Sequence, residues 1–270
     1  MRFGILEDKV IVVTGAGSGM GSSFARRCAE EGARVVLTDV NEASVGRVAS
    51  DIGAEAMVFD VTSSTAFTEA IDRVVDRYGR IDGLVNNAGI APVRDPQRTG
   101  IAIANQMLRM EGRLDDLTPT DDTVDLTDDQ WNQMIAVHLN GTFFGTRAAL
   151  SHMTRARSGS IVNISSILGL RPSAGAPHYC AAKAGIIALT KSVAHEVAPF
   201  AVRVNVVCPG WVDTPLLEPF EDTVKAAIKM QIPIGRMATP AELSEMVVFL
   251  LGPQSSYCIG DVFPVTGGWI

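Results

Sequence analysis

Three side chains able to do acid–base chemistry stand close together in this sequence: Ser166, Tyr179 and Lys183. Tyr179 and Lys183 are four positions apart, so on a helix they share one face. A free tyrosine, with a pKa of about 10, is a poor base at neutral pH, but a nearby ammonium favours the phenolate. The spacing therefore predicts a tyrosine acid–base tuned by Lys183, with a Ser166 hydroxyl to orient a substrate oxygen.

A glycine-rich turn, Thr14–Gly21, follows the first apolar run with the pattern Thr-Gly-x-x-x-Gly-x-Gly. Glycines let the backbone approach a pyrophosphate, and the helix expected next presents N–H groups to it. Asp39 ends the second run, where a carboxylate binds both ribose hydroxyls and repels a 2′-phosphate. Neither Ser18 nor Val40 supplies a cation. The pattern predicts NAD rather than NADP; the alternative, that Asp39 only caps a helix, is weakened because Asn41 can do so.

Seven short β-branched runs alternate with helical patterns and are typical of a doubly wound α/β fold. They are Val10–Val13, Arg34–Thr38, Glu55–Phe59, Ile81–Val85, Ser160–Ile164, Val202–Val207 and Val262–Thr266. We expect a seven-stranded parallel sheet in a single Rossmann-type domain over residues 1–270. Ligands bind at the carboxyl edge of such sheets, and Ser166 directly follows the fifth run.

Residues 91–126 are long for a strand–helix connection and form an expected insertion. Ile101, Ala104 and Leu108 have helical spacing within it, and Thr127 is placed to cap the next helix. A wall of the substrate cleft, a subunit contact and a solvated excursion all remain open for this segment. Its arginines could meet an anionic group: Arg94, Arg98, Arg109 and Arg113.

Composition excludes several classes of protein. The net charge of −7 argues against nucleic-acid and anionic-membrane partners, and no apolar run approaches the roughly 18 residues of a membrane span. The four cysteines form no CxxC pair, and the first nine residues lack a signal-peptide pattern. We expect reduced thiols, no metal site and a cytoplasmic location.

Taken together, these motifs resemble the short-chain dehydrogenase/reductase family from Lys9 to Gly268. The family's thirteen-residue spacing between serine and tyrosine selects Ser166 over the neighbouring Ser165. The resemblance implies hydride transfer between a nicotinamide cofactor and a secondary alcohol or ketone. It assigns cofactor contacts to Gly15, Ser18, Gly19, Met20, Gly21, Asp39, Asp60, Val61, Asn87, Ala88, Gly89, Tyr179, Lys183, Pro209, Gly210, Val212 and Thr214.

One position departs from the family pattern. Where the family has Asn-Leu-x-Gly, this sequence has His138 at the asparagine position, and Asn140 lies on roughly the opposite side of the helix. The family asparagine helps to hold a water that links the lysine to solvent. His138 either relays protons itself, since imidazole titrates near neutrality, or is filler while a backbone carbonyl holds the water.

The resemblance also implies a substrate lid over residues 211–238 and a homotetramer formed through the helices that carry His138 and Tyr179. The lid is apolar, which favours a lipophilic substrate, although packing on the sheet explains this equally well. Its apolar residues are Trp211, Leu216, Leu217, Phe220, Ile228 and Met230.

Three other functions were weighed. The runner-up is a 3-oxoacyl thioester reductase, which Asp39 fits poorly if the cofactor is NADPH. A non-catalytic NAD-sensing regulator would tolerate loss of the Ser-Tyr-Lys set, which this chain keeps. An extended sugar-nucleotide epimerase needs a different glycine spacing and a second domain.

Overall fold

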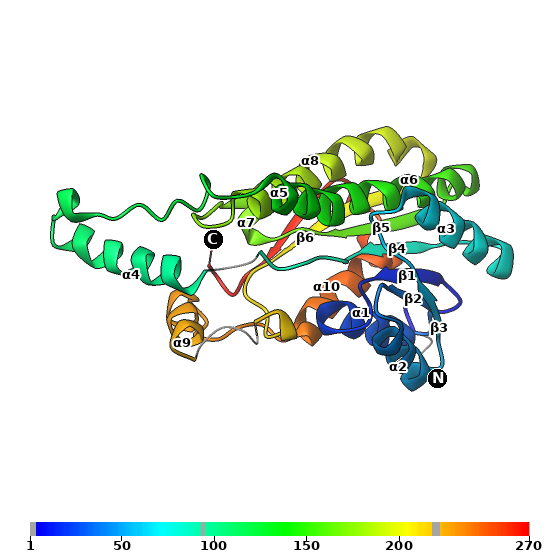
Figure 1. The fold of residues 1–270 in the computed structure, drawn as a ribbon. Helices are drawn as coiled ribbons and strands as arrows, with labels where there is room; N and C mark the ends of the chain where they lie inside the picture. Colours follow the sequence, from blue (N-terminus) through cyan, green and yellow to red (C-terminus); the bar gives the residue numbers. More distant parts are fainter. Residues whose placement is uncertain (1–3, 93–94, 218–221, 270) are drawn as a thin grey trace.

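A parallel sheet of seven strands lies at the centre of the computed structural model, which describes residues 4–92, 95–217 and 222–269 (Figure 1). Its strand order is β3-β2-β1-β4-β5-β6-β7, and every neighbouring pair is parallel. The strands are β1 Val10–Thr14, β2 Arg34–Asp39, β3 Glu55–Val58, β4 Gly83–Asn86, β5 Gly159–Ile164, β6 Val202–Pro209 and β7 Val262–Val265. The predicted doubly wound sheet is confirmed.

Both faces of the sheet are covered by helices, which explains the unbroken apolar runs. Along β1, Ile11 and Val13 enter one core and Val10 and Val12 enter the other. The first core is closed by α1 Gly19–Glu30, α2 Glu42–Ile52 and α10 Pro240–Leu251. The second is closed by α3 Ser64–Tyr78, α6 Gly141–Ala156 and α8 Pro177–Val197.

Local sequence signals fix the ends of several helices. The Asn41 side chain caps α2 by accepting the Ser44 N–H, as expected. Thr127 and Gln130 form a reciprocal capping box at the start of α5, Asp128–Ile135. A π-helical turn, η2 Ala136–Asn140, then joins α5 to α6. Shorter elements are α7 Ile167–Leu170, η3 Ala198–Phe200 and η5 Pro253–Ser255.

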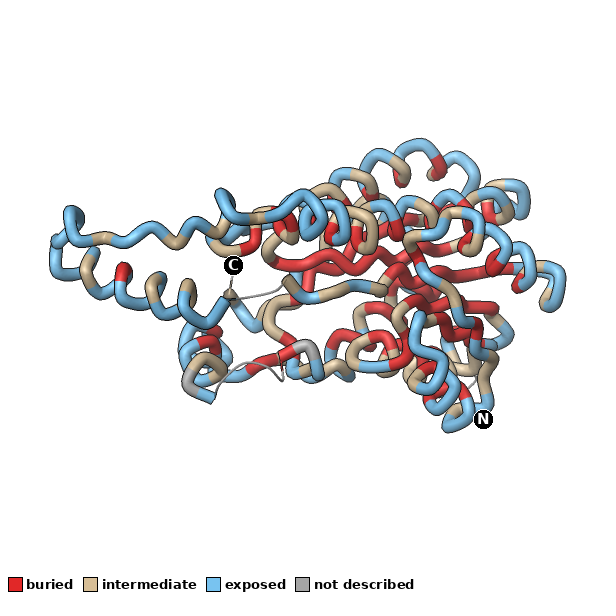
Figure 2. Tube along the Cα trace, in the orientation of Figure 1, coloured by how far each residue is buried: buried red, intermediate tan, exposed pale blue. Residues whose placement is uncertain are grey.

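The predicted insertion extends away from the sheet (Figure 1) and is exposed along most of its length (Figure 2). Its residues 95–126 are called the arm below; they contain α4 Pro96–Met110 and the one-turn helix η1 Leu114–Asp116. The predicted helix is therefore present. Of the three residues with helical spacing, Ala104 is exposed, because α4 meets little but its own return segment. Arg94 lies outside the described residues.

Residues 211–238 contain η4 Pro215–Leu217 and α9 Asp222–Gln231. Leu217 and Ile228 belong to a small buried cluster against which Trp211 packs, whereas Met230 is exposed. Phe220 and the Leu216 side chain lie outside the described residues. No helix in the described ranges is long and apolar enough to cross a bilayer.

Candidate active site

Ser166, Tyr179 and Lys183 meet at the carboxyl edge of the sheet. Ser166 follows β5 and caps α7 by accepting the Leu168 N–H at 3.1 Å, while the first turns of α8 carry the other two residues. The Ser166 hydroxyl faces the phenol of Tyr179 closely enough to favour its ionised form. The Lys183 ammonium donates to Ile164 O at 3.0 Å and lies 5.6 Å from the centroid of the Tyr179 ring. The structure therefore brings the three predicted residues together.

The neighbouring serine has a different role. Ser165 is buried, and its hydroxyl donates to Lys183 O at 2.7 Å, which fixes β5 to the backbone of α8. Its hydrogen-bonding capacity is directed into the fold, so Ser166 is the serine that faces Tyr179.

Burial controls the protonation of the pair. It raises the pKa of Tyr179, while the Ser166 hydroxyl acts in the opposite direction. Burial also lowers the pKa of Lys183 to about 7. The sequence predicts that the Lys183 ammonium and the positive nicotinamide together favour the phenolate; in the protein without cofactor, the desolvation of both buried groups has the larger effect. The protein without cofactor therefore disfavours the Tyr179 phenolate. Proton transfer to Tyr179 must be favoured by positive charge that the bound cofactor brings.

His138 lies inside the π-helical turn and is only 2% exposed. Its Nε2 atom is 3.1 Å from Ile90 N and 3.0 Å from Ile90 O. The imidazole edge meets the Tyr179 ring at 5.4 Å between centroids and an interplanar angle of 83°. Burial first, then the charge of Lys183, holds its pKa well below the usual 6.5. His138 is therefore a neutral imidazole in contact with the proposed acid–base.

A neutral imidazole cannot satisfy both backbone groups of Ile90. One ring nitrogen either accepts from the N–H or donates to the carbonyl, according to the tautomer. The other nitrogen, Nδ1, is buried and has no hydrogen-bond partner among the described residues. The ring of His138 is thus held in place at Ile90, but its Nδ1 atom has no hydrogen-bond partner among the described residues. Both predicted roles of His138, proton relay and filler, stay open.

The glycine-rich turn forms a cradle that side chains would fill. A Cβ on Gly21 would lie 2.1 Å from Gly15 O, and one on Gly17 would lie 2.2 Å from the Ser44 hydroxyl. Gly15 and Gly19 also have positive φ, at 62° and 53°. Ser18 makes no side-chain bond to the first N–H groups of α1, which leaves this helix start suited to a phosphate. The turn fits the pyrophosphate of a dinucleotide.

Asp39 stands at the end of β2 with its carboxylate fixed by backbone. Oδ2 accepts the Gly17 N–H at 3.0 Å and Oδ1 accepts the Asn41 N–H at 3.0 Å. These bonds orient the group beside the turn and leave further lone pairs for ribose hydroxyls. Val40 next to it is 64% exposed and uncharged.

The segment after β4 is tied to β1 through the hydroxyl of Thr14, the first residue of the predicted turn, which was not among the predicted cofactor contacts. Thr14 Oγ1 accepts the N–H groups of Asn87 at 3.0 Å and Ala88 at 3.1 Å. The Asn87 amide donates to Thr14 O and Gly15 O. A Cβ on Gly89 would come within 2.5 Å of His138. In the sequence, the sign of this role is a single threonine, Thr14, at the end of a strand that is otherwise apolar.

Asn86 and Asn163, also missed as site residues, join β4 to β5. Asn86 Nδ2 donates to Asn163 Oδ1 at 2.9 Å, and Asn163 Nδ2 donates to Thr190 Oγ1 on α8 at 2.9 Å. All three side chains are buried. Amides inside apolar strands are the signal that could have revealed this network.

The remaining predicted cofactor residues follow other strand ends. Asp60 accepts the Thr62 N–H and is exposed, and Val61 packs against the start of α6. Beyond β6, Gly210 N donates to Val265 O, and Val212 forms a bridge with Ala238. Met20 packs at the margin of the first core.

Thr214 and Pro209 bracket the loop that leads into the lid region. Pro209 ends β6 and is buried. The side chain of Thr214 lies 3.7 Å from where a Cβ on Gly19 would stand. The loop therefore reaches back to the glycine-rich turn.

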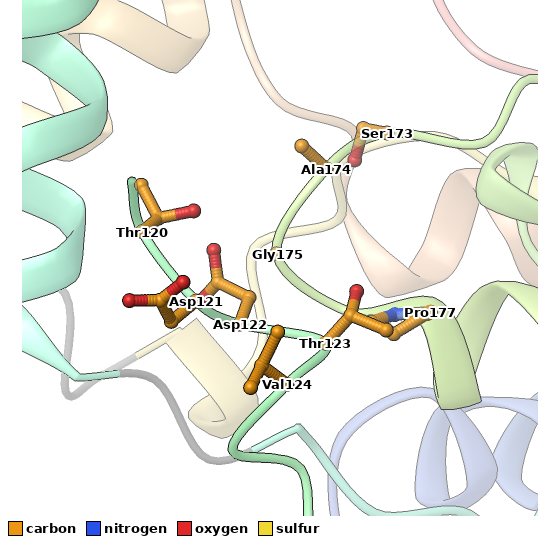
Figure 3. A pocket seen from close by; sticks show the side chains of 9 residues that line it. All are labelled: Thr120, Asp121, Asp122, Thr123, Val124, Ser173, Ala174, Gly175 and Pro177. Atoms are coloured by element: carbon orange, nitrogen blue, oxygen red, sulfur yellow. The ribbon is translucent and has the colours of Figure 1, made fainter. Parts of the chain in front are cut away.

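The seam between the arm and the loop before α8 contains two hollows of about 250 Å³ each. Figure 3 shows the first, which is lined by residues 120–124 of the arm on one side and by the Ser173–Pro177 loop on the other. The second includes Arg98, but its guanidinium pairs with Asp125 at 2.6 Å and Asp95 at 3.5 Å. Arg113 likewise pairs within the arm, with Glu111 and Asp116. These arginines are neutralised rather than poised for an anion.

Within the described ranges, no group of three or more His, Cys, Asp or Glu side chains could hold a metal ion. All four cysteines are free thiols; Cys28, Cys180 and Cys208 are buried, and Cys258 is partly buried.

Comparisons with known proteins agree with this geometry. Residues 9–225 match the family model described as short chain dehydrogenase. A 3-oxoacyl-(acyl-carrier-protein) reductase of Thermotoga maritima is 34% identical over 270 residues, covering 98% of this chain and 99% of the relative. The cis-4-hydroxycyclohexanecarboxylate dehydrogenase of Sinomonas cyclohexanicum is 37% identical over 266 residues, covering 97% and 96%. The crystal structure of 3-ketoacyl-(acyl-carrier-protein) reductase from Brucella melitensis complexed with NADH superposes with a TM-score of 0.83, at 30% identity and covering 98% and 99%.

Proposed function

Because the chain belongs to the short-chain dehydrogenase family, we propose that it moves a hydride between NAD and the carbinol carbon of a secondary alcohol, or the carbonyl carbon of the matching ketone. The observation that carries the proposal is the contact of Ser166, Tyr179 and Lys183 at the carboxyl edge of the sheet. A regulator without turnover has no need of that arrangement.

The residues divide the chemistry between them. When bound, the oxidised nicotinamide supplies the hydride acceptor and a positive ring charge. The Ser166 hydroxyl orients the substrate oxygen, and Tyr179 takes the hydroxyl proton as the C–H hydride leaves. In its protonated form Lys183 places a positive charge beside the phenolate, and its amine can bind the nicotinamide ribose. In the reducing direction Tyr179 returns the proton to the substrate oxygen.

Incoming positive charge also explains how a tyrosine with a raised pKa can act. Burial disfavours the phenolate, and a positive ring nearby in the same low-dielectric site offsets that cost more strongly than it would in water. Proton transfer is therefore coupled to cofactor binding. Tyr179 should be an effective base in the binary complex and a poor one in the protein alone.

For the cofactor, we propose NAD over NADP because of Asp39. Its carboxylate is fixed by two backbone N–H groups, so it cannot easily turn away from a 2′-phosphate. The Asp39 carboxylate would repel a 2′-phosphate bound beside it, because two negative charges would then lie close together. The Brucella melitensis relative was crystallised with NADH, which is compatible with this choice.

For the substrate, we propose a lipophilic secondary alcohol, with residues 211–238 as the lid. The buried cluster of Leu217, Ile228, Ile232 and Met237 gives this segment an apolar body. A relative at 37% identity is named for cis-4-hydroxycyclohexanecarboxylate, a cyclic secondary alcohol that also carries a carboxylate. Relatives named as 3-oxoacyl thioester reductases make that substrate the second candidate.

The test is a screen of cyclic and acyclic alcohols, ketones and 3-oxoacyl thioesters with NAD(H) and NADP(H), read at the nicotinamide absorbance. We expect turnover of at least one neutral secondary alcohol with NAD. Tyr179→Phe should bind NADH normally but lose at least about 10³-fold in turnover, in the range typical of a lost general acid–base. Tyr257→Phe, at a side chain 97% exposed, is the matched control.

Two outcomes would count against the proposal. Substantial turnover by Tyr179→Phe would remove Tyr179 as the acid–base. Binding of NAD with no turnover of any substrate would favour the regulator.

A further inference from the structure

The chain beyond β7 ends among segments that border the candidate active site. Residues 266–269 are called the tail below, and Figure 1 shows them between α7 and α9. The guanidinium of Arg171, directly after α7, donates to Trp269 O at 3.5 Å. Ile234 N, shortly after α9, donates to Gly267 O at 3.2 Å. The tail therefore connects α7, the helix that follows β5, to the end of the predicted lid.

Two glycines give the tail its path. Gly267 and Gly268 have positive φ, at 64° and 93°, a conformation that other residues adopt only with strain. A Cβ on Gly267 would lie 2.8 Å from Ile234 Cγ2. A Cβ on Gly268 would lie 3.1 Å from Pro233 Cβ. The backbone therefore runs tightly against the predicted lid, and Trp269 is the first residue after this turn that has a side chain.

The Trp269 indole lies beside a second indole. Its ring centroid is 6.1 Å from that of Trp211, at an interplanar angle of 59°. Trp211 follows Pro209 and Gly210, which are predicted to contact the cofactor, and packs against the buried cluster of the lid. Both tryptophans are only partly buried. The pair therefore presents aromatic surface next to both the cofactor loop and the lid.

Apolar side chains in the two segments that hold the tail are also left uncovered by the described residues. Leu170, the last residue of α7, is 41% exposed, and Ile234 is 59% exposed. Exposed apolar surface that gathers in one place marks a ligand or partner site. This surface adjoins α7, which begins directly after Ser166, at the sheet edge where ligands of such folds bind. Its position therefore favours a ligand that also reaches Ser166.

Indole surfaces favour a ring over an open chain. An aromatic face is flat, rigid and large, and it contacts another ring over much of its area. A ring enters such a contact already rigid, whereas an open chain gives up rotation about each bond that it holds still. The pair of Trp211 and Trp269 therefore discriminates between ligands by their shape rather than by their charge.

On the basis of the proposed function, we propose that Trp269 and Trp211 form an aromatic wall of the substrate site and that Trp269 selects a ring-bearing secondary alcohol or ketone over an open-chain one. The reacting carbon lies at Ser166 and Tyr179, and the ring of the substrate packs on the Trp269 indole. Arg171 and the two tail glycines are positioning residues, because they fix where that indole stands.

Steady-state kinetics with cyclohexanol and 2-hexanol, which have equal numbers of carbon atoms, test the wall. Trp269→Ala should lower the ratio of kcat/KM for cyclohexanol over 2-hexanol at least about tenfold, mainly through KM, as expected for a lost aromatic anchor. Trp269→Phe keeps a flat ring and should restore most of the ratio. Tyr257→Ala, at a side chain 97% exposed, is the control and should leave the ratio unchanged. An unchanged ratio in Trp269→Ala would overturn the proposal, even though turnover by the parent upheld the proposed function.

A binding measurement keeps the test independent of turnover. N-cyclohexylformamide and N-hexylformamide each offer a carbonyl oxygen to Ser166 and Tyr179 but hold no ketone to reduce. In calorimetry with the NADH complex, the parent should bind the cyclohexyl compound at least about tenfold more tightly than the hexyl compound, and Trp269→Ala should lose this preference.

The two measurements separate the wall from the proposed chemistry. A ring preference that depends on Trp269, without turnover of any alcohol or ketone, would support the wall and refute hydride transfer. Turnover without a ring preference would refute the wall alone. Circular dichroism and gel filtration confirm that each variant keeps its fold and assembly, and a Trp269→Ala that changed only the assembly would overturn the proposal.

Discussion

His138 allows the sharpest test of how the site holds its acid–base. The imidazole reaches Ile90 with one nitrogen and packs edge-on against Tyr179. His138→Gln keeps a polar group of similar reach, and a carboxamide can accept from one Ile90 group while it donates to the other. His138→Ala removes the ring and leaves both backbone groups of Ile90 without the side chain that they meet in this structure.

The expected magnitudes follow from those contacts. Leaving a buried polar group unsatisfied costs about 1–3 kcal/mol, and an aromatic edge contact contributes about 0.5–1.5 kcal/mol. His138→Ala should therefore lower the free energy of unfolding by about 2–4 kcal/mol and, by loosening the Tyr179 ring, reduce kcat about 10²-fold. His138→Gln should stay within about 1 kcal/mol and tenfold of the parent. Urea unfolding and steady-state kinetics measure both quantities.

The pH profile separates positioning from proton relay. Because burial and Lys183 hold the pKa of His138 well below 6.5, the ring is neutral from pH 6.5 upwards and should contribute no ionisation to kcat between pH 6.5 and 9. The profile of His138→Gln should therefore match that of the parent. If His138→Gln instead lost 10²-fold or more in kcat at normal stability, and added imidazole restored it, a relay through this ring would be established and the reasoning refuted.

Three further substitutions test neighbouring parts of the site. Asp39→Ala should shift the ratio of kcat/KM for NAD over NADP at least tenfold towards NADP; an unchanged ratio would show that this carboxylate does not select the cofactor. Lys183→Met removes an amine whose pKa falls from 10.5 in the unfolded chain to about 7 in the folded protein. Between pH 7 and 10.5 the unfolded chain therefore binds one proton more than the folded protein, so the free energy of unfolding of the parent rises with pH. From pH 7 to 9 that gain should be about 2 kcal/mol in urea unfolding of the cofactor-free protein and should be missing in Lys183→Met; parallel pH curves would contradict the assigned burial. Ser166→Ala should cost turnover with little change in stability, and Ser165→Ala should do the reverse; the opposite pattern in paired assays would exchange their roles.

Much of the fold could be predicted because its signals are local. The strands are apolar runs of the right length, and the caps at Asn41 and Thr127 are set by neighbouring residues. The cofactor turn could be located because its glycines are needed where the backbone itself crowds, as at Gly21. Each of these features depends on a few residues adjacent in the chain.

The features that escaped prediction depend on burial and distant contacts. The pKa of Tyr179 is raised because the fold buries it, which no four-residue spacing reports. The contact of His138 with Ile90 joins positions 48 residues apart. The sequence predicted the arm as an insertion that contains a helix. Its periodicity could not show whether the apolar side chains of that helix pack against the sheet domain or are exposed to solvent.

The pairing of Asn86 with Asn163 has a consequence for how the chain folds. The two residues stand opposite one another in the β4–β5 register. Neighbouring strands rich in valine and isoleucine would tolerate a shifted alignment at little cost, since one apolar side chain replaces another. A shift at this position would instead bury two amides among hydrocarbon, at about 1–3 kcal/mol for each unmet group. The amide pair therefore favours the native register of β4 and β5, in which the carboxyl ends of both strands stand at matching heights.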